Sequence, residues 1–213
     1  SWSRIRTGKF NTSFHVSVGA REFVVRVAPP DDTVFCFYER RMMRQEPGIH
    51  QLLLSKTDVP VPRIVFFDDS RELIDRDYMV MERVSGRPMT EAVWADHEKV
   101  LAQVGHYLRQ THRLIAGQNG YGPGYGYLGE HRPHEPQKSW PAAFRLMWGK
   151  LIDDVASVGH YDAREQRMMR DMLERRIEIF DRPMVPSLLH MDVWHQNIMV
   201  DEHSNVTGLI DWD

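Results

Sequence analysis

The sequence has 213 residues, which is enough for one large domain or for two small lobes with a sizeable apolar core. Hydrophobic residues make up 42% and charged residues 27%, and the formal net charge of -3 gives no reason to expect nucleic acid or an acidic membrane as a partner. The single Cys36 rules out an internal disulfide and suits a reducing compartment. Since no apolar run reaches the length of a membrane span and Ser1–Arg4 opens no signal peptide, we expect a cytoplasmic location.

Two strands are predicted near the start of the chain. Residues 14–18 and 23–27 are short β-prone runs, and Gly19–Glu22 is the turn between them. Arg26 is the one charge in the second run, and an arginine facing a sheet edge is its simplest interpretation. A small polar loop, Thr7–Ser13, precedes the first run.

This loop contains one glycine, Gly8, and ends in two hydroxyl residues, Thr12 and Ser13. Its backbone N–H groups and hydroxyls could fold over phosphates, although an ordinary hairpin loop has the same composition. The loop alone therefore leaves both interpretations open.

A helical region is predicted after the second strand, from Pro29 to Glu46. Its large apolar residues recur at helical spacing, and Pro47 would open a second helix because proline favours the first helical turn. Two acids, Glu39 and Glu46, lie in the first region. The recurring residues are Phe35, Tyr38, Met42 and Met43.

Two more strands precede a change of pattern. Val59–Phe67 is an extended entry into a strand, and Tyr78–Glu82 is the next strand, followed by a turn that ends at Gly86. After Gly86 the apolar period changes from 2 to 3.6, so we expect a lobe boundary there.

Three helices are predicted in the second part of the chain. The first runs from about Trp94 to Ile115, and the second is capped by Ser139. Asp162-x-x-Glu165 is a capping box for the third. The third helix should bury Met168, Met169, Met172, Leu173 and Phe180.

The last two dozen residues carry the chemistry. Ile198–Val200 and Gly208–Ile210 read as a hairpin, which would bring Asp211 back beside Asn197. One carboxylate, Asp192, can then face a hydroxyl. Asn197 and Asp211 supply oxygen ligands suited to Mg²⁺, which favours a few protein oxygens together with substrate phosphates.

The pattern His190-x-Asp192-x-x-x-x-Asn197, followed by Ile210-Asp211, resembles the aminoglycoside phosphotransferase and choline kinase family. The resemblance implies an α+β, protein-kinase-like fold of two lobes. The β-rich, nucleotide-binding lobe with its hinge would span residues 1–85, and the mainly helical lobe with the catalytic hairpin would span residues 86–213. Family members continue past this hairpin into further helices, so we expect the helical lobe to be incomplete at its C-terminal end.

The resemblance also implies roles for individual residues. Asp192 would accept the proton of the substrate hydroxyl, and Asn197 and Asp211 would hold Mg²⁺. Arg26 would contact the α- and β-phosphates, where protein kinases use Lys, and Glu46 would fix it, with Glu39 as the alternative acid. Met191 departs from the small residue that the family has there. The remaining nucleotide contacts would be the loop residues Gly8, Asn11, Thr12 and Ser13, the gatekeeper Met81, the Glu82 carbonyl and the Val84 N–H.

The expected function is Mg²⁺-dependent transfer of the γ-phosphate of ATP or GTP to a hydroxyl of a small molecule. The competing hypothesis is a kinase-like module that binds nucleotide without turnover, and the complete set Asp192, Asn197 and Asp211 favours the enzyme. The resemblance offers aminoglycosides, choline-like amino alcohols, homoserine and sugar amines as acceptors. Nothing in the sequence selects among them, and it does not reveal the oligomeric state.

Overall fold

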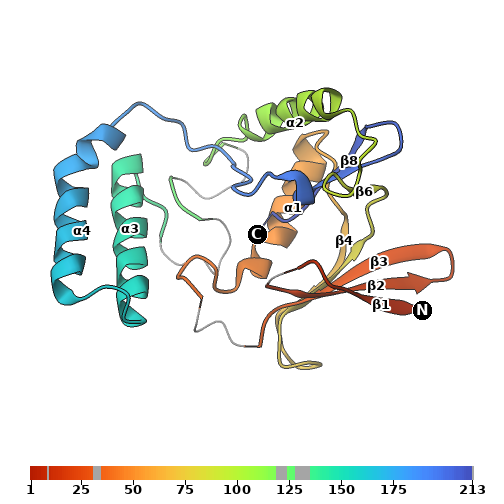
Figure 1. Ribbon diagram of the computed structural model, residues 1–213, viewed down its shortest axis with the longest axis horizontal. Helices are drawn as coiled ribbons and strands as arrows, with labels where there is room; N and C mark the ends of the chain where they lie inside the picture. The colour runs from red at the N-terminus through yellow and green to blue at the C-terminus, as the bar shows by residue number, and fades with distance from the viewer. Residues whose placement is uncertain (9, 31–34, 119–123, 128–134, 213) are drawn as a thin grey trace. The chain divides into compact units, whose positions relative to one another are not determined.

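The computed structural model describes residues 1–8, 10–30, 35–118, 124–127 and 135–212. The chain forms two compact units, drawn in Figure 1. The first unit comprises Ser1–Asp31, Arg41–Arg113 and Leu188–Asp213, and the second comprises Asp32–Arg40 and Leu114–Ser187. The lobe boundary predicted at residue 86 falls within the first unit and stays a prediction.

A five-stranded antiparallel sheet dominates the first unit, with strand order β1-β2-β3-β5-β4 (Figure 1). The strands predicted around residues 14–18, 23–27, 64–67 and 78–82 are all present. Their bounds are Trp2–Ile5 for β1, Thr12–Val18 for β2, Arg21–Val27 for β3, Ile64–Asp68 for β4 and Tyr78–Glu82 for β5.

The register of this sheet places two of the predicted nucleotide-binding residues differently from the sequence interpretation. Thr12 and Ser13 are the first residues of β2 and do not belong to the loop, and Ser13 lies opposite Arg26. Lys9, in the middle of the predicted loop, lies outside the described residues. Arg26 is not at a sheet edge, because β3 pairs with β2 on one side and with β5 on the other.

An apolar cluster packs on one face of the sheet. Met79 and Met81 alternate as the buried residues of β5, and Met43 joins them from outside the sheet. Because side chains on a strand alternate between faces, this spacing turns both methionines to the same side. Val24, Ala28, Ile64 and Phe67 pack against the cluster.

The helix predicted over residues 29–46 is wrong where the structure describes it. Residues 37–41 form turns, and only Met42–Arg44 form a short 3-10 helix, η1. Arg41, at the start of η1, has a left-handed backbone with φ 57°, which interrupts a right-handed helix. The second predicted helix is confirmed as α1, Glu46–Lys56, with Pro47 in its first turn.

A three-stranded sheet, β6-β7-β8, carries the C-terminal residues of the first unit. Its strands are Arg87–Pro88, Ile198–Val200 and Val206–Leu209, so the predicted hairpin is confirmed. Helix α2, His97–Thr111, is capped by the Asp96 carboxylate, which accepts from Lys99 N–H at 3.1 Å. The Gln103 side chain of α2 accepts a 3.0 Å hydrogen bond from Val206 N–H of β8.

The turn into β6 depends on Gly86, which has φ +91°. A Cβ atom there would lie 2.3 Å from the carbonyl oxygen of Val200, so Gly86→Ala combines a left-handed backbone with a clash against β7. We expect this variant to lose about 2 kcal/mol or more of unfolding free energy in urea titrations.

Gly19→Ala is the matched control, because Gly19 also has a positive φ, +61°, but a Cβ atom added there would meet nothing within 4 Å. It should lose only the backbone term, about 1 kcal/mol. Equal losses in the two variants would contradict the proposed clash with Val200.

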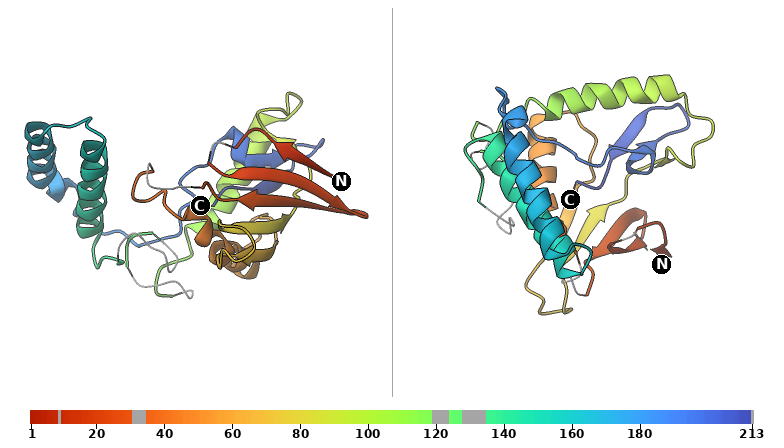
Figure 2. Two further views of the ribbon diagram at one scale, coloured as in Figure 1. Left: turned by 90° about the horizontal axis from the view of Figure 1, so that it is seen from below. Right: turned by 60° about the vertical axis from the view of Figure 1, so that its left-hand side comes forward.

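The second unit contains two helices that run side by side, α3 (Trp140–Ser157) and α4 (Ala163–Arg176), as the views in Figure 1 and Figure 2 agree. The predicted caps are confirmed: Ser139 accepts from Ala142 N–H, and Asp162 and Glu165 form a capping box. The predicted buried face of α4 is wrong, because Met168 is 56% exposed and no residue of α4 is buried.

The chain after α4 continues as a 3-10 helix, η2 (Ile177–Phe180), in which Phe180 stacks on Phe144 with ring centroids 3.8 Å apart. Among the described residues, no helix combines the length and the apolar character needed to cross a bilayer.

Candidate active site

The loop that enters the β7–β8 hairpin joins the predicted catalytic residue, Asp192, to one of the predicted metal ligands, Asn197. The Asn197 side-chain amide donates to the Asp192 carbonyl oxygen and to its Oδ2 atom, both at 3.0 Å. Asn197 is buried in the short 3-10 helix η3 (His195–Asn197), whereas Asp192 is exposed. A buried amide therefore orients an exposed carboxylate. A general base that takes a proton from a substrate hydroxyl needs this combination of exposure and fixed orientation.

The residues around Asp192 make this loop a defined turn. Met191 has φ 70°, and the buried His190 ring lies 4.2 Å from the Trp212 ring, measured between centroids. The His190 Nδ1 atom accepts from Asp192 N–H at 3.4 Å. The turn thus packs against the residue that follows Asp211, which links the two ends of the predicted motif.

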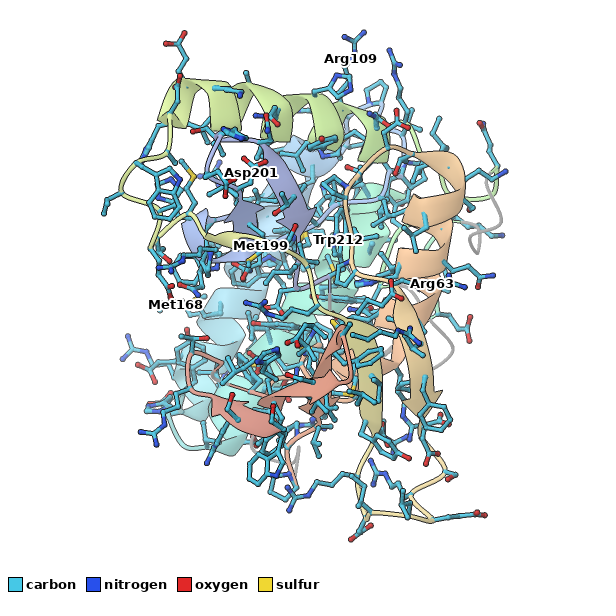
Figure 3. All side chains as sticks on the ribbon, turned by 90° about the vertical axis from the view of Figure 1, so that its right-hand side faces the viewer. Arg63, Arg109, Met168, Met199, Asp201 and Trp212 are labelled. Carbon is cyan, nitrogen blue, oxygen red and sulfur yellow. The ribbon has the colours of Figure 1, made fainter. Side chains whose placement is uncertain are left out.

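Asp211 follows the end of β8 and lies next to Asn197 in the backbone pairing. Ile210 N–H donates to the Asn197 carbonyl oxygen at 3.0 Å, which continues the hairpin beyond its last paired residues. Asp211 itself has φ 71°, a conformation that Asp tolerates better than most residues. Trp212 is buried and donates from Nε1 to the Leu209 carbonyl, and Figure 3 labels it together with Met199 and Asp201 of the hairpin.

Arg26 connects the large sheet with this C-terminal segment. Its Nη1 atom lies 2.6 Å from Glu46 Oε1, and its Nη2 atom lies 3.0 Å from Asp211 Oδ1. The Glu46 side chain is fully buried and that of Arg26 is 12% exposed, so the carboxylate depends on its cation in a region of low polarity. Strand β3, helix α1 and the segment after β8 therefore meet at one guanidinium.

The acid that pairs with Arg26 is thus Glu46. Glu39, the alternative, belongs to the second unit and accepts a 2.8 Å hydrogen bond from Cys36 N–H. Pro47 does not separate Glu46 from its helix, because α1 begins at Glu46 and proline is compatible with the first turn.

The donor set around Asn197 and Asp211 fits a magnesium ion. The Asn197 amide nitrogen donates to Asp192, which leaves the amide oxygen to act as a metal ligand. The Asp211 carboxylate can accept from Arg26 and still bind a cation with its other lone pairs. Within the described parts of the chain, no three His, Cys, Asp or Glu side chains form a metal-binding group. Magnesium commonly takes only one or two protein ligands plus phosphate oxygens and water.

Two of the predicted nucleotide-loop residues, Gly8 and Asn11, lie in the first unit just before β2. Gly8 and Asn11 line a cavity of about 330 Å³ together with Arg4, Ile5 and Arg6. A Cβ atom on Gly8 would lie 3.2 Å from the Asn11 carbonyl oxygen, so the loop is tight there. The structure thus gives these loop residues a concave surface.

The predicted hinge residues lie at the end of β5 and after it: Met81 and Glu82 are the last two residues of that strand, and Val84 lies between β5 and β6. Met81 is part of the apolar cluster, Glu82 N–H donates to the Arg63 carbonyl oxygen at 2.9 Å, and the Glu82 side chain is 3.4 Å from Arg21. The Val84 side chain packs so closely on Gly208 that a Cβ atom on that glycine would lie 2.7 Å from it. The adenine-binding roles of the hinge stay predictions.

One residue beside the site was not found from the sequence. His50 is buried, donates from Nδ1 to the Pro62 carbonyl at 2.8 Å, and holds Nε2 4.0 Å from Glu46 Oε1. The signal that could have found it was its spacing, because residues four apart on a helix face the same side. His50 thereby helps to fix the turn of α1 that carries Glu46.

Solved structures share the fold of this chain. A thermostable mutant of aminoglycoside phosphotransferase APH(4)-Ia, in a ternary complex with AMP-PNP and hygromycin B, matches with TM-score 0.68 and 17% identity. The match covers 99% of this chain and 65% of that one. The GDP and kanamycin complex of APH(2")-IIia matches with TM-score 0.59 and 16% identity, over 100% of this chain and 66% of that one. These likenesses confirm the α+β, protein-kinase-like fold.

The sequence is also similar to that of the human protein "Acyl-CoA dehydrogenase family member 11", with 23% identity over 220 residues. The match covers 99% of this chain but only 25% of the human protein, so the chain spans about a quarter of that relative's length.

The family model described as "Phosphotransferase enzyme family" matches residues 1–213. The resemblance first noted in the His190, Asp192, Asn197 and Asp211 pattern is thereby confirmed over the whole sequence. The chain belongs to the phosphotransferase enzyme family.

Proposed function

We propose that this chain binds ATP or GTP with Mg²⁺ and transfers the γ-phosphate to a hydroxyl group of a small molecule. The observation that carries the proposal is that Arg26 contacts both Glu46 and Asp211. The hydrogen bond from Ile210 N–H to the Asn197 carbonyl keeps Asp211 next to Asn197, whose side chain in turn binds Asp192. A cation for phosphates, oxygen ligands for a metal and an exposed carboxylate thus lie on one connected set of elements.

Asp192 is the group that acts on the acceptor. The acceptor oxygen forms its bond to the γ-phosphorus as the bond from that phosphorus to the β–γ bridging oxygen breaks, and the hydroxyl proton passes to Asp192. Little covalent chemistry is asked of the protein, so its contribution is positioning and charge stabilisation. The hydrogen bond from Asn197 to Oδ2 orients the Asp192 carboxylate for this role, and the bond to the Asp192 carbonyl oxygen holds its backbone.

Arg26, Asn197 and Asp211 act on the nucleotide. Asn197 and Asp211 would hold Mg²⁺, which neutralises phosphate charge when it is bound. Arg26 offers a planar fork of donors to the α- and β-phosphates, and Glu46 keeps this fork from swinging away. Gly8 and Asn11 of the loop, Thr12 and Ser13 at the start of β2, and the hinge residues Met81, Glu82 and Val84 would enclose the rest of the nucleotide.

Both nucleotides remain in the proposal because the similar structures are complexes with AMP-PNP in one case and with GDP in the other. The acceptors bound in those complexes, hygromycin B and kanamycin, make aminoglycosides the first compounds to test. Choline-like amino alcohols, homoserine and sugar amines follow. A cytoplasmic location is part of the proposal because the single Cys36 suits a reducing compartment.

The test is transfer of label from [γ-³²P]ATP or GTP to a panel of these acceptors by the purified protein, with and without Mg²⁺. We expect a phosphorylated product from at least one acceptor only when Mg²⁺ is present. Nucleotide binding without transfer to any acceptor would instead favour a kinase-like binding module, and the absence of both would overturn the proposal.

A further inference from the structure

A second ion cluster lies in the first unit, outside the residues used so far. Asp77 directly precedes β5 and is 1% exposed. Its carboxylate is bound by Arg44, from Nε at 2.5 Å and from Nη2 at 2.9 Å, and by Arg71, from Nε at 2.9 Å. Such a two-pronged contact from one arginine fixes orientation as well as charge.

The cluster remains ionic despite its burial. Loss of hydration works against the charged form, but the hydrogen bonds from Arg44 and Arg71 outweigh it and hold the pKa of Asp77 below its ordinary value. A buried carboxylate that keeps its charge binds its arginines strongly, and removing one partner is costly.

The place of Arg44 in the chain connects this cluster to the candidate active site. Arg44 is the last residue of η1, and Glu46 follows two residues later as the first residue of α1. In the β3–β5 pairing, Arg26 lies opposite Met79, and Met79 is two residues after Asp77 in the chain. The Arg26–Glu46 pair therefore ties β3, and the Asp77–Arg44 pair ties the start of β5, to the same short segment, residues 44–46.

Two further contacts lie between these ion pairs. Ala28 N–H donates to the Asp77 carbonyl oxygen at 2.9 Å, which holds the ends of β3 and β5 together. Met43, directly before Arg44, is 2% exposed and packs in the apolar cluster with Met79. A three-residue 3-10 turn is weak by itself, so these side chains determine where α1 begins.

We propose that Asp77 and Arg44 are positioning residues, which hold the segment before α1 so that Glu46 meets Arg26 and the Arg26 guanidinium is fixed toward the nucleotide. The inference rests on the proposed function in taking Arg26 as a phosphate ligand. Its structural part, control of the Arg26–Glu46 pair through Arg44, can be measured without any nucleotide.

Arg71 provides the matched control. Both arginines bind the Asp77 carboxylate, but the Arg71 side chain is 43% exposed and lies in the loop between β4 and β5, whereas Arg44 leads directly into α1. Arg44→Gln and Arg71→Gln each remove one cation from Asp77. If the cluster only stabilises the unit, both variants should affect Arg26 in the same way.

The first measurement is the ¹⁵N NMR signal of the Arg26 guanidinium in the nucleotide-free protein, assigned with Arg26→Lys and recorded well below Tm. We expect resolved, slowly rotating N–H signals in the parent protein and in Arg71→Gln, and averaged or broadened signals in Arg44→Gln. Arg44→Lys keeps the charge but not the two-pronged contact, so its Arg26 signals should be intermediate between those of the parent protein and those of Arg44→Gln. Arg26 signals unchanged in Arg44→Gln would overturn the proposal.

The second measurement is the affinity for Mg-AMP-PNP. Arg44→Gln should weaken it by about tenfold and Arg71→Gln by less than about twofold, within the range of couplings between groups in one network. In a Glu46→Gln background the Arg44→Gln effect should disappear, because Arg44 acts through Glu46. Equal effects in both backgrounds would mean that Arg44 has a merely structural role.

The two proposals fail differently. If the parent protein binds no nucleotide but Arg44→Gln still frees the Arg26 guanidinium, the positioning role holds and the proposed function is wrong. If nucleotide binds and Arg44→Gln leaves both the Arg26 signals and the affinity unchanged, the proposed function survives and the positioning role is wrong.

Discussion

Replacing Asp192 with Asn is expected to lower kcat by about 10² to 10⁴, the usual contribution of a general base, while the Kd for Mg-nucleotide changes little. The variant keeps the size of the side chain. Its new amide can still present an oxygen to the Asn197 side chain, which now donates to Asp192 Oδ2 at 3.0 Å, so the loop should keep its shape. Only the charge that would accept the substrate proton is lost. The measurements are kcat, Kd and Tm on one preparation.

Asp201→Asn is the matched control for a structural acid in the same hairpin. The Asp201 carboxylate accepts from His203 N–H at 2.9 Å and from Asn205 N–H at 2.8 Å, so it closes the turn between β7 and β8. This variant should lower Tm, because its amide nitrogen cannot replace the Oδ2 atom that accepts from the Asn205 side chain at 2.9 Å, and it should leave kcat largely intact. Asp192→Asn with unchanged kcat would sink the catalytic assignment, and a parallel fall in kcat, affinity and Tm would make Asp192 a capping residue instead.

The hairpin that carries Asn197 and leads to Asp211 could be predicted because its information is local. Two β-prone runs and a short polar connection determine that the chain returns, and the return itself brings Ile210 N–H to the Asn197 carbonyl. The capping box at Asp162 and Glu165 is local in the same sense. In both places a few neighbouring residues contain the whole physical cause.

The error over residues 35–46 has a nonlocal cause. The apolar residues that recur at helical spacing there pack in two different units, because Tyr38 stacks on Tyr127 in the second unit and Met43 packs with Met79 in the first. A left-handed residue, Arg41, separates them, and nothing in its side chain indicates that conformation. Periodicity cannot distinguish one buried face from two.

The pairing of Arg26 was also beyond sequence reasoning. Glu39 and Glu46 have the same chemistry, and only the tertiary placement of α1 brings Glu46 to 2.6 Å from the guanidinium. The Asp77–Arg44 contact that adjoins it spans 33 residues and leaves no periodic signal. The exposure of Met168 on α4 is a further case, since an amphipathic pattern predicts a covered face but does not supply the partner that covers it.

Replacing Asp211 is expected to abolish the part of nucleotide affinity that depends on Mg²⁺. Asp211→Asn is the better variant, because the residue has φ 71° and Asn tolerates this left-handed conformation, whereas Ala would add about 1 kcal/mol of strain. The amide keeps an oxygen that can accept from Arg26, now 3.0 Å from Asp211 Oδ1, but it lacks the charge that binds a hard cation. Titrating AMP-PNP against the protein with and without Mg²⁺ measures the difference directly.

The Mg²⁺-free affinity separates a ligand role from a structural one. Since Arg26 keeps its contact with Glu46 in the variant, binding without Mg²⁺ should stay close to that of the parent protein, and Tm should change little. Glu202→Gln, which removes an exposed charge from the turn of the same hairpin, controls for the loss of one negative charge and should retain the full effect of Mg²⁺. If Asp211→Asn shows the same gain in affinity on adding Mg²⁺ as the parent protein, Asp211 is not a metal ligand, and its contact with Arg26 is then its main role.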